Sequence, residues 1–236
     1  MFYYLAVAGN IIAVVLGIIV IVRWIKAKTS AKQIFENLGF VPFKLSELIT
    51  GLFIGLVAIS ILFAILFFLE STKIVSIEFH FSSFIRIFIQ LLIFVLLEEI
   101  IFRSLFINGL KQFTDNKLYI LLYSALLFAI VHLANPGVSP LSVVSASLGG
   151  AMYAYAFLIM NRLWLPIGIH FSWNFIQGYL YGLPVSGLGM DSLFRTDLIG
   201  SDIITGGTYG PEGSITGIFA RFLVFLLLYS VDRNKQ

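Results

Sequence analysis

Residues 91–110 read LLIFVLLEEIIFRSLFINGL, an apolar run that carries two adjacent glutamates and an arginine. A helix that crosses a bilayer needs about 20 mostly apolar residues, and this run is long enough. Ionisable side chains inside such a helix cost free energy unless they are paired or hydrated. The run therefore predicts a membrane-spanning helix in which Glu98, Glu99 and Arg103 are candidates for function.

The composition of the whole chain agrees with a lipid environment. Of its 236 residues, 59% are hydrophobic and only 11% are charged, whereas about a quarter of the residues of an ordinary soluble protein are charged. This excludes an ordinary soluble domain and a disordered chain. Cysteine is absent, so any chemistry must use carboxylates, imidazoles, hydroxyls and amides.

Apolar runs between charged or glycine-rich breaks predict the fold class. We expect an all-α, polytopic helical bundle in the membrane with about seven transmembrane helices. The expected spans lie near residues 4–22, 47–69, 84–110, 118–134, 141–160, 163–181 and 215–231. We divide the chain into N-terminal helices with a basic loop (1–83) and a core (84–232).

Basic residues predict the orientation, because they favour cytoplasmic loops. With the N-terminus outside and the C-terminus in the cytoplasm, the outer loops hold only Lys73 and Arg195 clear of span ends. The inner loops then hold Arg23, Lys26, Lys28, Lys32, Lys44, Lys111, Lys117, Arg162, Arg233 and Lys235. We expect a multi-pass cell-membrane protein with an interfacial helix ending near Gly39. The glycine-rich segment 182–214, with Asp191, Asp197, Asp202 and Glu212 on the outer face, is expected to be a loop or a lid.

Two further spans carry polar residues at a similar depth. His132 lies in YSALLFAIVHLANPG (123–137), and His170 and Asn174 lie in LWLPIGIHFSWNFIQG (163–178). Counted from the expected cytoplasmic ends, Glu98, His132 and Asn174 lie roughly 18 to 22 Å deep. Three helices thus place polar groups in one layer, which favours a single shared site.

Helical spacing suggests different roles for the two glutamates. Glu99 and Arg103 are four residues apart and can pair along one helix face. Glu98 is turned about 100° away and is free to face another helix. His170 and Asn174 are also four residues apart, so an imidazole and a carboxamide project side by side.

These residue types predict hydrolytic chemistry with two possible forms. The chain has no Gly-x-Ser-x-Gly and no His-Glu-x-x-His motif. A glutamate and a histidine meeting across two helices can act as general bases on a water, and His170 and Asn174 can stabilise the oxyanion. Alternatively, Glu98, His132 and His170 can hold zinc or another divalent metal. The sequence leaves both forms open.

The order of three motifs resembles a known family. EEIIFR (98–103) fits E-E-x-x-x-R, FAIVH (128–132) fits F-x-x-x-H, and HFSWN (170–174) fits H-x-x-x-N. Over roughly residues 84–232 the chain resembles the CPBP family of intramembrane proteases. This family comprises CAAX proteases and bacteriocin-processing (Abi) enzymes and is related to type II CAAX prenyl endopeptidases.

The resemblance implies an intramembrane protease with defined site residues. Glu98 and His132 would activate the water, His170 and Asn174 would stabilise the oxyanion, and Glu99 with Arg103 would brace the helix. Family members are often labelled metalloproteases, and the metal stays open here. The implied substrates are peptides or membrane proteins, from prenylated CAAX tails to bacteriocins, and implied roles include bacteriocin immunity.

Two other functions use the same residues. A non-hydrolytic immunity factor or scaffold would bind a peptide or partner in the cavity, and a proton-coupled transporter would use the glutamates and histidines as a relay. The transporter is disfavoured because no inverted repeat is evident. Besides a peptide substrate, the lipid bilayer is the expected partner. Nothing indicates nucleic-acid binding, and the sequence does not indicate an oligomeric state.

Overall fold

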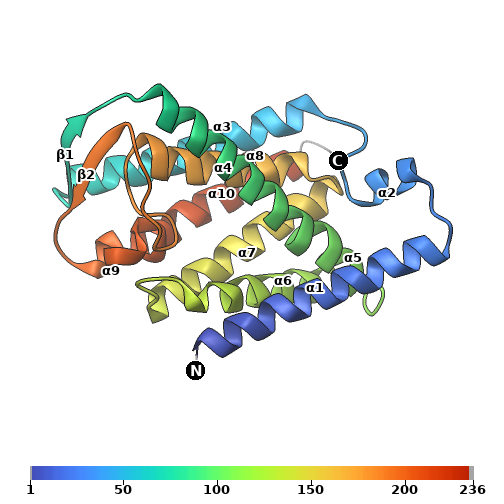
Figure 1. Cartoon of the computed structure of the whole chain (residues 1–236). Coiled ribbons are helices and arrows are strands. Elements are labelled where there is room, and N and C mark those ends of the chain that lie inside the picture. Colours follow the sequence, from blue (N-terminus) through green and yellow to red (C-terminus); the bar gives the residue numbers. More distant parts are fainter. Residues whose placement is uncertain (1, 234–236) are drawn as a thin grey trace.

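A computed structural model describes residues 2–233, and within them the chain is a bundle of helices with one small sheet (Figure 1). Met1 and the expected cytoplasmic Lys235 lie outside the described residues. About 73% of the chain is helical. The long helices are α1 (Phe2–Lys26), α3 (Leu45–Phe68), α4 (Phe81–Glu99), α6 (Lys117–Val131), α7 (Pro140–Met160), α8 (Trp164–Asn174) and α10 (Ile215–Arg233). The short helices are α2 (Ala31–Asn37), α5 (Phe106–Leu110) and α9 (Asp202–Thr205).

The helical membrane class expected from the sequence is confirmed. Within residues 2–233, five helical segments are each long and apolar enough to cross a membrane, namely Tyr4–Lys26, Leu45–Phe68, Lys117–Ala134, Pro140–Met160 and Ile215–Arg233. The other two expected spans are also helical, but their winding changes along the way. Helix α4 continues as a π-helix at Ile100–Leu105 and then as α5, and α8 continues as a π-helix at Phe175–Leu180.

Helices α3 and α8 pack backbone to backbone because glycines line their contact. A Cβ atom on Gly51 would lie 2.9 Å from the Ile169 nitrogen, and one on Gly55 would lie 2.7 Å from the Ile169 carbonyl oxygen. On the facing helix, a Cβ on Gly168 would lie 2.8 Å from the Leu52 nitrogen. Small residues spaced in this way allow the close helix approach that stabilises membrane bundles. Helix α8, which carries His170 and Asn174, is thereby fixed against α3.

A two-stranded antiparallel sheet joins segments that are distant in the sequence. Strand β1 (Thr72–Ile77) pairs with β2 (Phe194–Leu198). The sheet and α9 lie at one end of the bundle, and α2 lies at the other end (Figure 1). This sheet adds to the expected all-α architecture, and it shows that the segment 182–214 is folded rather than a plain loop.

The opposite end of the bundle is held by polar contacts between helices. The guanidinium of Arg162, after α7, donates to the carboxylate of Glu47 in α3, with Nε 3.0 Å from each carboxylate oxygen. The side-chain amide of Asn108 donates to the Asn37 carbonyl oxygen at 2.9 Å. No residue of α2 is buried, and its position at the membrane interface stays a prediction. The division of the chain at residue 83 stays a prediction, although α3 and α8 pack closely across it.

Candidate active site

Glu98 and Glu99 lie at the point where α4 ends and the π-helix begins. Single π-helical turns inside helices occur frequently at functional sites, because the wider turn shifts the register of the following side chains. The Glu99 side chain is fully buried, whereas Glu98 is partly buried and lines a cavity. The two adjacent carboxylates therefore have different surroundings, as the helical spacing predicts.

The His170 ring lies between the two glutamates. Its Nδ1 is 2.8 Å from Oε1 of Glu99, and its Nε2 is 3.5 Å from Oε2 of Glu98. Since a carboxylate only accepts, we assign the Nδ1 proton as donated to Glu99. The ring also stacks on Tyr153 with the centroids 4.4 Å apart. His170 is thus fixed in orientation with Nε2 toward Glu98.

Arg103 forms the expected ion pair with Glu99, in a fully buried position. Its Nε is 3.2 Å from Oε2 of Glu99, although the direction of the N–H bond does not suit a hydrogen bond. The guanidinium lies over the rings of Phe128 and Tyr153, 4.6 and 5.1 Å from their centroids. Ionic attraction and cation–π contacts therefore hold Arg103. This arrangement couples α4, α6 and α7 behind the site.

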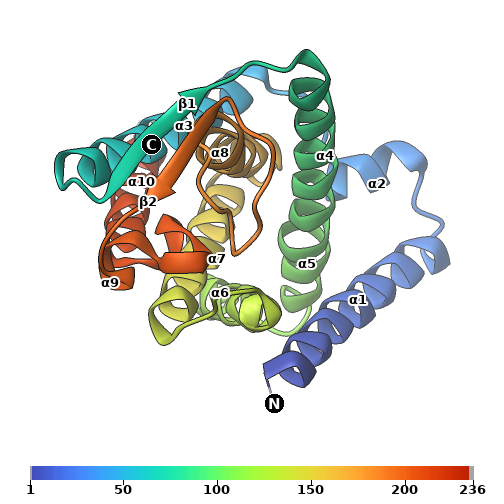
Figure 2. The ribbon, with the colours of Figure 1, turned by 60° about the vertical axis from the view of Figure 1, so that its left-hand side comes forward.

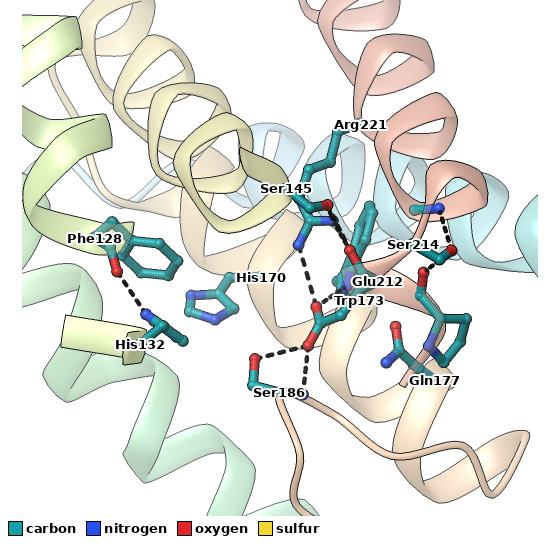
Figure 3. A network of polar contacts seen from close by, with 12 residues as sticks. Phe128, His132, Ser145, His170, Trp173, Gln177, Ser186, Glu212, Ser214 and Arg221 are labelled. Carbon is teal, nitrogen blue, oxygen red and sulfur yellow. Dashed lines mark hydrogen bonds and ion pairs between the residues drawn. The ribbon is translucent and has the colours of Figure 1, made fainter. Parts of the chain in front are cut away.

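His132 reaches the site from the end of α6, where the helix tightens into a 3₁₀ turn (His132–Ala134). Its Nδ1 lies 2.7 Å from the carbonyl oxygen of Phe128. A carbonyl oxygen accepts, so we assign the proton to Nδ1, which leaves the Nε2 lone pair free. Figure 3 shows this contact beside the His170 ring. His132 is half-buried.

One cavity collects the polar side chains expected to share a layer. Its volume is about 620 Å³, and Glu98, His132, His170 and Asn174 all line it. Apolar residues of α4 and of the segment before β2 complete the walls; they include Ile87, Leu91, Phe94, Val185, Leu188 and Met190. Figure 2 shows that segment between α4 on one side and α9 and α10 on the other. The side chains expected in one layer thus line one cavity, and their action as a single site stays a prediction.

Glu212 and Arg221 also line this cavity, and sequence reasoning missed both as site residues. Glu212, expected in the loop or lid 182–214, is buried, and its place on the outer side of the membrane stays a prediction. Its carboxylate lies 3.3 Å from Nη2 of Arg221. An arginine within the apolar run 215–231 was a signal available in the sequence, because charged residues inside spans are rare and functional.

A metal ion is the other form of chemistry that the sequence leaves open for this cavity. Among residues 2–233, no group of three His, Asp or Glu side chains is placed to hold a metal ion. The three alternative ligands line one cavity. Nδ1 of His132 contacts the Phe128 carbonyl oxygen and Nδ1 of His170 contacts Glu99, so a metal would have to be held through the Nε2 atoms.

Fold and cavity together define a multi-pass helical membrane protein with a carboxylate and imidazole site inside the bundle. Residues 80–176 match the family model of the type II CAAX prenyl endopeptidase Rce1-like proteins, so this segment is similar to that family. The family implies a CAAX-type intramembrane protease acting on a peptide substrate. No curated protein and no solved structure matches the chain. The matched segment includes all six expected site residues, whereas Glu212 and Arg221 lie outside it.

Proposed function

We propose that this protein is an intramembrane endopeptidase that hydrolyses a peptide bond of a membrane-associated substrate, using a water activated by Glu98 and His132. One observation carries the proposal: Glu98, His132, His170 and Asn174, from three separate helices, line a single cavity within the bundle. A carboxylate and an imidazole beside one water supply the general bases that hydrolysis needs.

The first step is the attack of water on the scissile carbonyl carbon. The Glu98 carboxylate takes a proton from the water, and the free Nε2 of His132 accepts the water's second hydrogen bond. The water oxygen bonds to the carbonyl carbon, and the carbonyl electron pair moves to its oxygen. When the intermediate collapses, the carbon–nitrogen bond breaks and the proton passes to the leaving amine.

His170 and Asn174 would stabilise the negative oxygen of this intermediate. The Asn174 carboxamide lines the cavity one helical turn after His170, and its N–H group can donate to the oxyanion. His170 in its doubly protonated form can donate from Nε2, because Glu99 accepts the proton on Nδ1. Each well-placed oxyanion donor contributes about 2.7 to 4 kcal/mol to catalysis.

The apolar walls of the cavity favour a substrate with apolar side chains near the cleaved bond. Candidates are a prenylated CAAX tail and a bacteriocin-like peptide. With the N-terminus outside, the segment before β2 forms part of the cavity wall on the outer side. A site opening outward or sideways into the bilayer follows from that orientation, which stays a prediction.

The test is cleavage in proteoliposomes of farnesylated CAAX peptides, their unprenylated forms and a library of apolar membrane peptides. We expect wild type to cleave at least one class, Glu98→Gln to lose activity, and Glu78→Gln to retain it. Glu78 is the matched control because its exposed carboxylate lies outside the cavity. Wild-type activity that persists with a strong chelator supports catalysis without metal.

Two results would contradict the proposal. If chelation abolishes cleavage and added zinc restores it, Glu98 and the histidines act as metal ligands. If wild type binds peptides but cleaves none, and Glu98→Gln binds equally well, the protein is a binding or immunity factor that uses the same cavity.

A further inference from the structure

The Glu212 carboxylate makes more contacts than any other acidic side chain in the cavity. Its Oε1 accepts from the backbone N–H of Ser186 at 2.5 Å and from the Ser186 hydroxyl at 2.7 Å. Its Oε2 accepts from the indole N–H of Trp173 at 2.9 Å and lies 3.3 Å from Nη2 of Arg221. Figure 3 shows these contacts converging on one carboxylate.

This arrangement leaves no free lone pair for proton transfer. A carboxylate has about four acceptor positions, and four donors occupy them here. Arg221 also balances the negative charge, and its Nη1 donates to the Glu212 backbone oxygen at 2.7 Å. Space for the guanidinium exists because residue 149 is glycine: a Cβ there would lie 3.0 Å from Nε of Arg221. Glu212 is therefore placed to hold neighbours rather than to act as a base.

The neighbour that it holds is a tight turn at the cavity wall. Val185 and Leu188 exchange two backbone hydrogen bonds of 2.9 Å, with Ser186 and Gly187 at the tip. Both tip residues have positive φ angles, 49° and 82°, as in the hairpin turns that favour glycine and asparagine. A serine in this conformation is strained. The two hydrogen bonds that Ser186 donates to Glu212 offset that strain and fix the turn.

The turn carries the apolar side chains that face the proposed site. Val185, Leu188 and Met190 line the same cavity as Glu98 and His170. On its other side, Glu212 fixes Trp173, the residue before Asn174. One carboxylate thus joins the apolar wall to the helix that bears the proposed oxyanion donor.

We propose that Glu212, balanced by Arg221, is a positioning residue that sets a subsite for an apolar substrate side chain next to the cleaved bond. The subsite wall is the turn 185–190. This inference rests on the proposed function and extends it to residues outside the segment matched by the family model. Through Ser186, Glu212 fixes how far the wall stands from the catalytic groups, and so which side chains fit.

Cleavage kinetics test the subsite with peptides that carry alanine, valine, leucine or phenylalanine beside the scissile bond. Replacing the carboxylate in Glu212→Gln removes a charged hydrogen bond to the wall, so we expect KM to rise about tenfold for the preferred peptide. We expect kcat to change by less than about threefold, because the catalytic groups remain. The preference among the four side chains should narrow or vanish, and Glu78→Gln should match wild type.

Two more variants separate positioning from loss of folding. Ser186→Gly removes only the hydroxyl contact and suits the positive φ, so it should show the same change in preference, but smaller. Glu212→Gln alone leaves the buried charge of Arg221 unbalanced. If that variant does not fold, the double variant Glu212→Gln with Arg221→Gln, which removes both charges, should fold. A preference like that of wild type in this double variant would overturn the proposal.

A distance measurement gives a readout that does not depend on cleavage. The chain has no cysteine, so Gly189→Cys and Ile93→Cys can carry spin labels without background. A Cβ on Gly189 meets no atom within 4 Å, and Ile93 is exposed on α4. We expect a narrow distance distribution in the labelled parent and a broader one after Glu212→Gln.

The outcomes distinguish the two proposals. If the distances, KM and side-chain preference all stay unchanged in Glu212→Gln while wild type cleaves, the positioning role is wrong and the protease function stands. A fall in kcat with unchanged KM would also overturn it, by placing Glu212 in the chemistry. If wild type cleaves nothing, the proposed function fails, and an unchanged distance distribution would then reject the fixed wall as well.

Discussion

Asn174 offers the clearest distinction between binding and turnover at the scale of single residues. Its carboxamide lines the cavity, and Asn174 is not one of the proposed general bases. We expect Asn174→Ala to lower kcat about 10² to 10³-fold, as loss of one oxyanion donor does elsewhere. KM should change little, because the donor acts mainly in the transition state. Steady-state kinetics with the preferred peptide measures both constants.

Asn37→Ala is the matched control for that variant, because Asn37 ends α2 and does not line the cavity. It should leave both constants unchanged. A rise in KM with kcat intact in Asn174→Ala would instead make Asn174 a binding residue and favour the scaffold alternative.

Breaking the buried ion pair of Glu99 and Arg103 is expected to lower the stability of the protein. Arg103→Met leaves an uncompensated carboxylate in a fully buried position. Breaking a buried pair in this way costs about 3 to 5 kcal/mol. We expect the free energy of unfolding to fall by that order in Arg103→Met and to recover in Glu99→Gln combined with Arg103→Met. Denaturant unfolding in detergent micelles measures it.

The double variant should still lack activity, because His170 then loses the carboxylate that orients its ring. Lys32→Met is the comparison, since Lys32 pairs with Glu36 at 3.9 Å on the surface and such pairs contribute about 0 to 1 kcal/mol. Equal losses in Arg103→Met and Lys32→Met would contradict the structural role of the buried pair.

At the scale of elements, the contact between α3 and α8 decides where His170 and Asn174 lie. A Cβ atom on Gly55 would collide with the Ser172 hydroxyl oxygen and lie 2.7 Å from the Ile169 carbonyl oxygen. We expect Gly55→Ala to destabilise the protein by about 1 to 3 kcal/mol, as overpacking does. Activity should fall with it, because α8 must move away. Unfolding and cleavage of the same preparation measure both.

Gly109→Ala is the control for this substitution, because its nearest neighbour would be an ordinary contact of 3.5 Å with Leu16. It should keep wild-type stability and activity. If Gly55→Ala is as stable and active as Gly109→Ala, the close approach of α3 and α8 does not position the site.

The two π-helical segments show what helical periodicity misses at this scale. One begins directly after Glu99 and the other directly after Asn174. The pattern of apolar residues correctly predicts both spans, but it does not reveal a local change in winding. Tertiary packing selects such turns, since each costs regular hydrogen bonding that neighbouring helices must offset.

At the scale of the whole molecule, the expected orientation in the membrane can be tested by cysteine labelling. With the N-terminus outside, Lys32 in α2 faces the cytoplasm and Asp197 in β2 faces outward. These residues lie in elements at opposite ends of the bundle (Figure 1). In intact cells, a membrane-impermeant thiol reagent should label the Asp197→Cys variant. It should label the Lys32→Cys variant only after the membrane is permeabilised. The reverse pattern would invert the orientation and place the opening of the cavity toward the cytoplasm.

The sequence by itself determines the membrane class, the seven helical ranges and the residues that carry the proposed chemistry. Apolar length and spacing of four residues are local properties, and lipid penalises every unpaired charge, so Glu98, His132 and His170 stand out without a structure. The same reasoning predicts the pair of Glu99 and Arg103, because both lie on one helix.

Only the tertiary structure decides which groups meet across helices. The structure places the His170 ring between both glutamates, and it places Glu212, from the segment expected to be a loop or lid, in the cavity wall. The sheet of β1 and β2 likewise joins strands from two distant segments. These contacts depend on the packing of α3, α8 and α10 in three dimensions. A one-dimensional pattern records the spacing along each helix, but it contains no distance between helices.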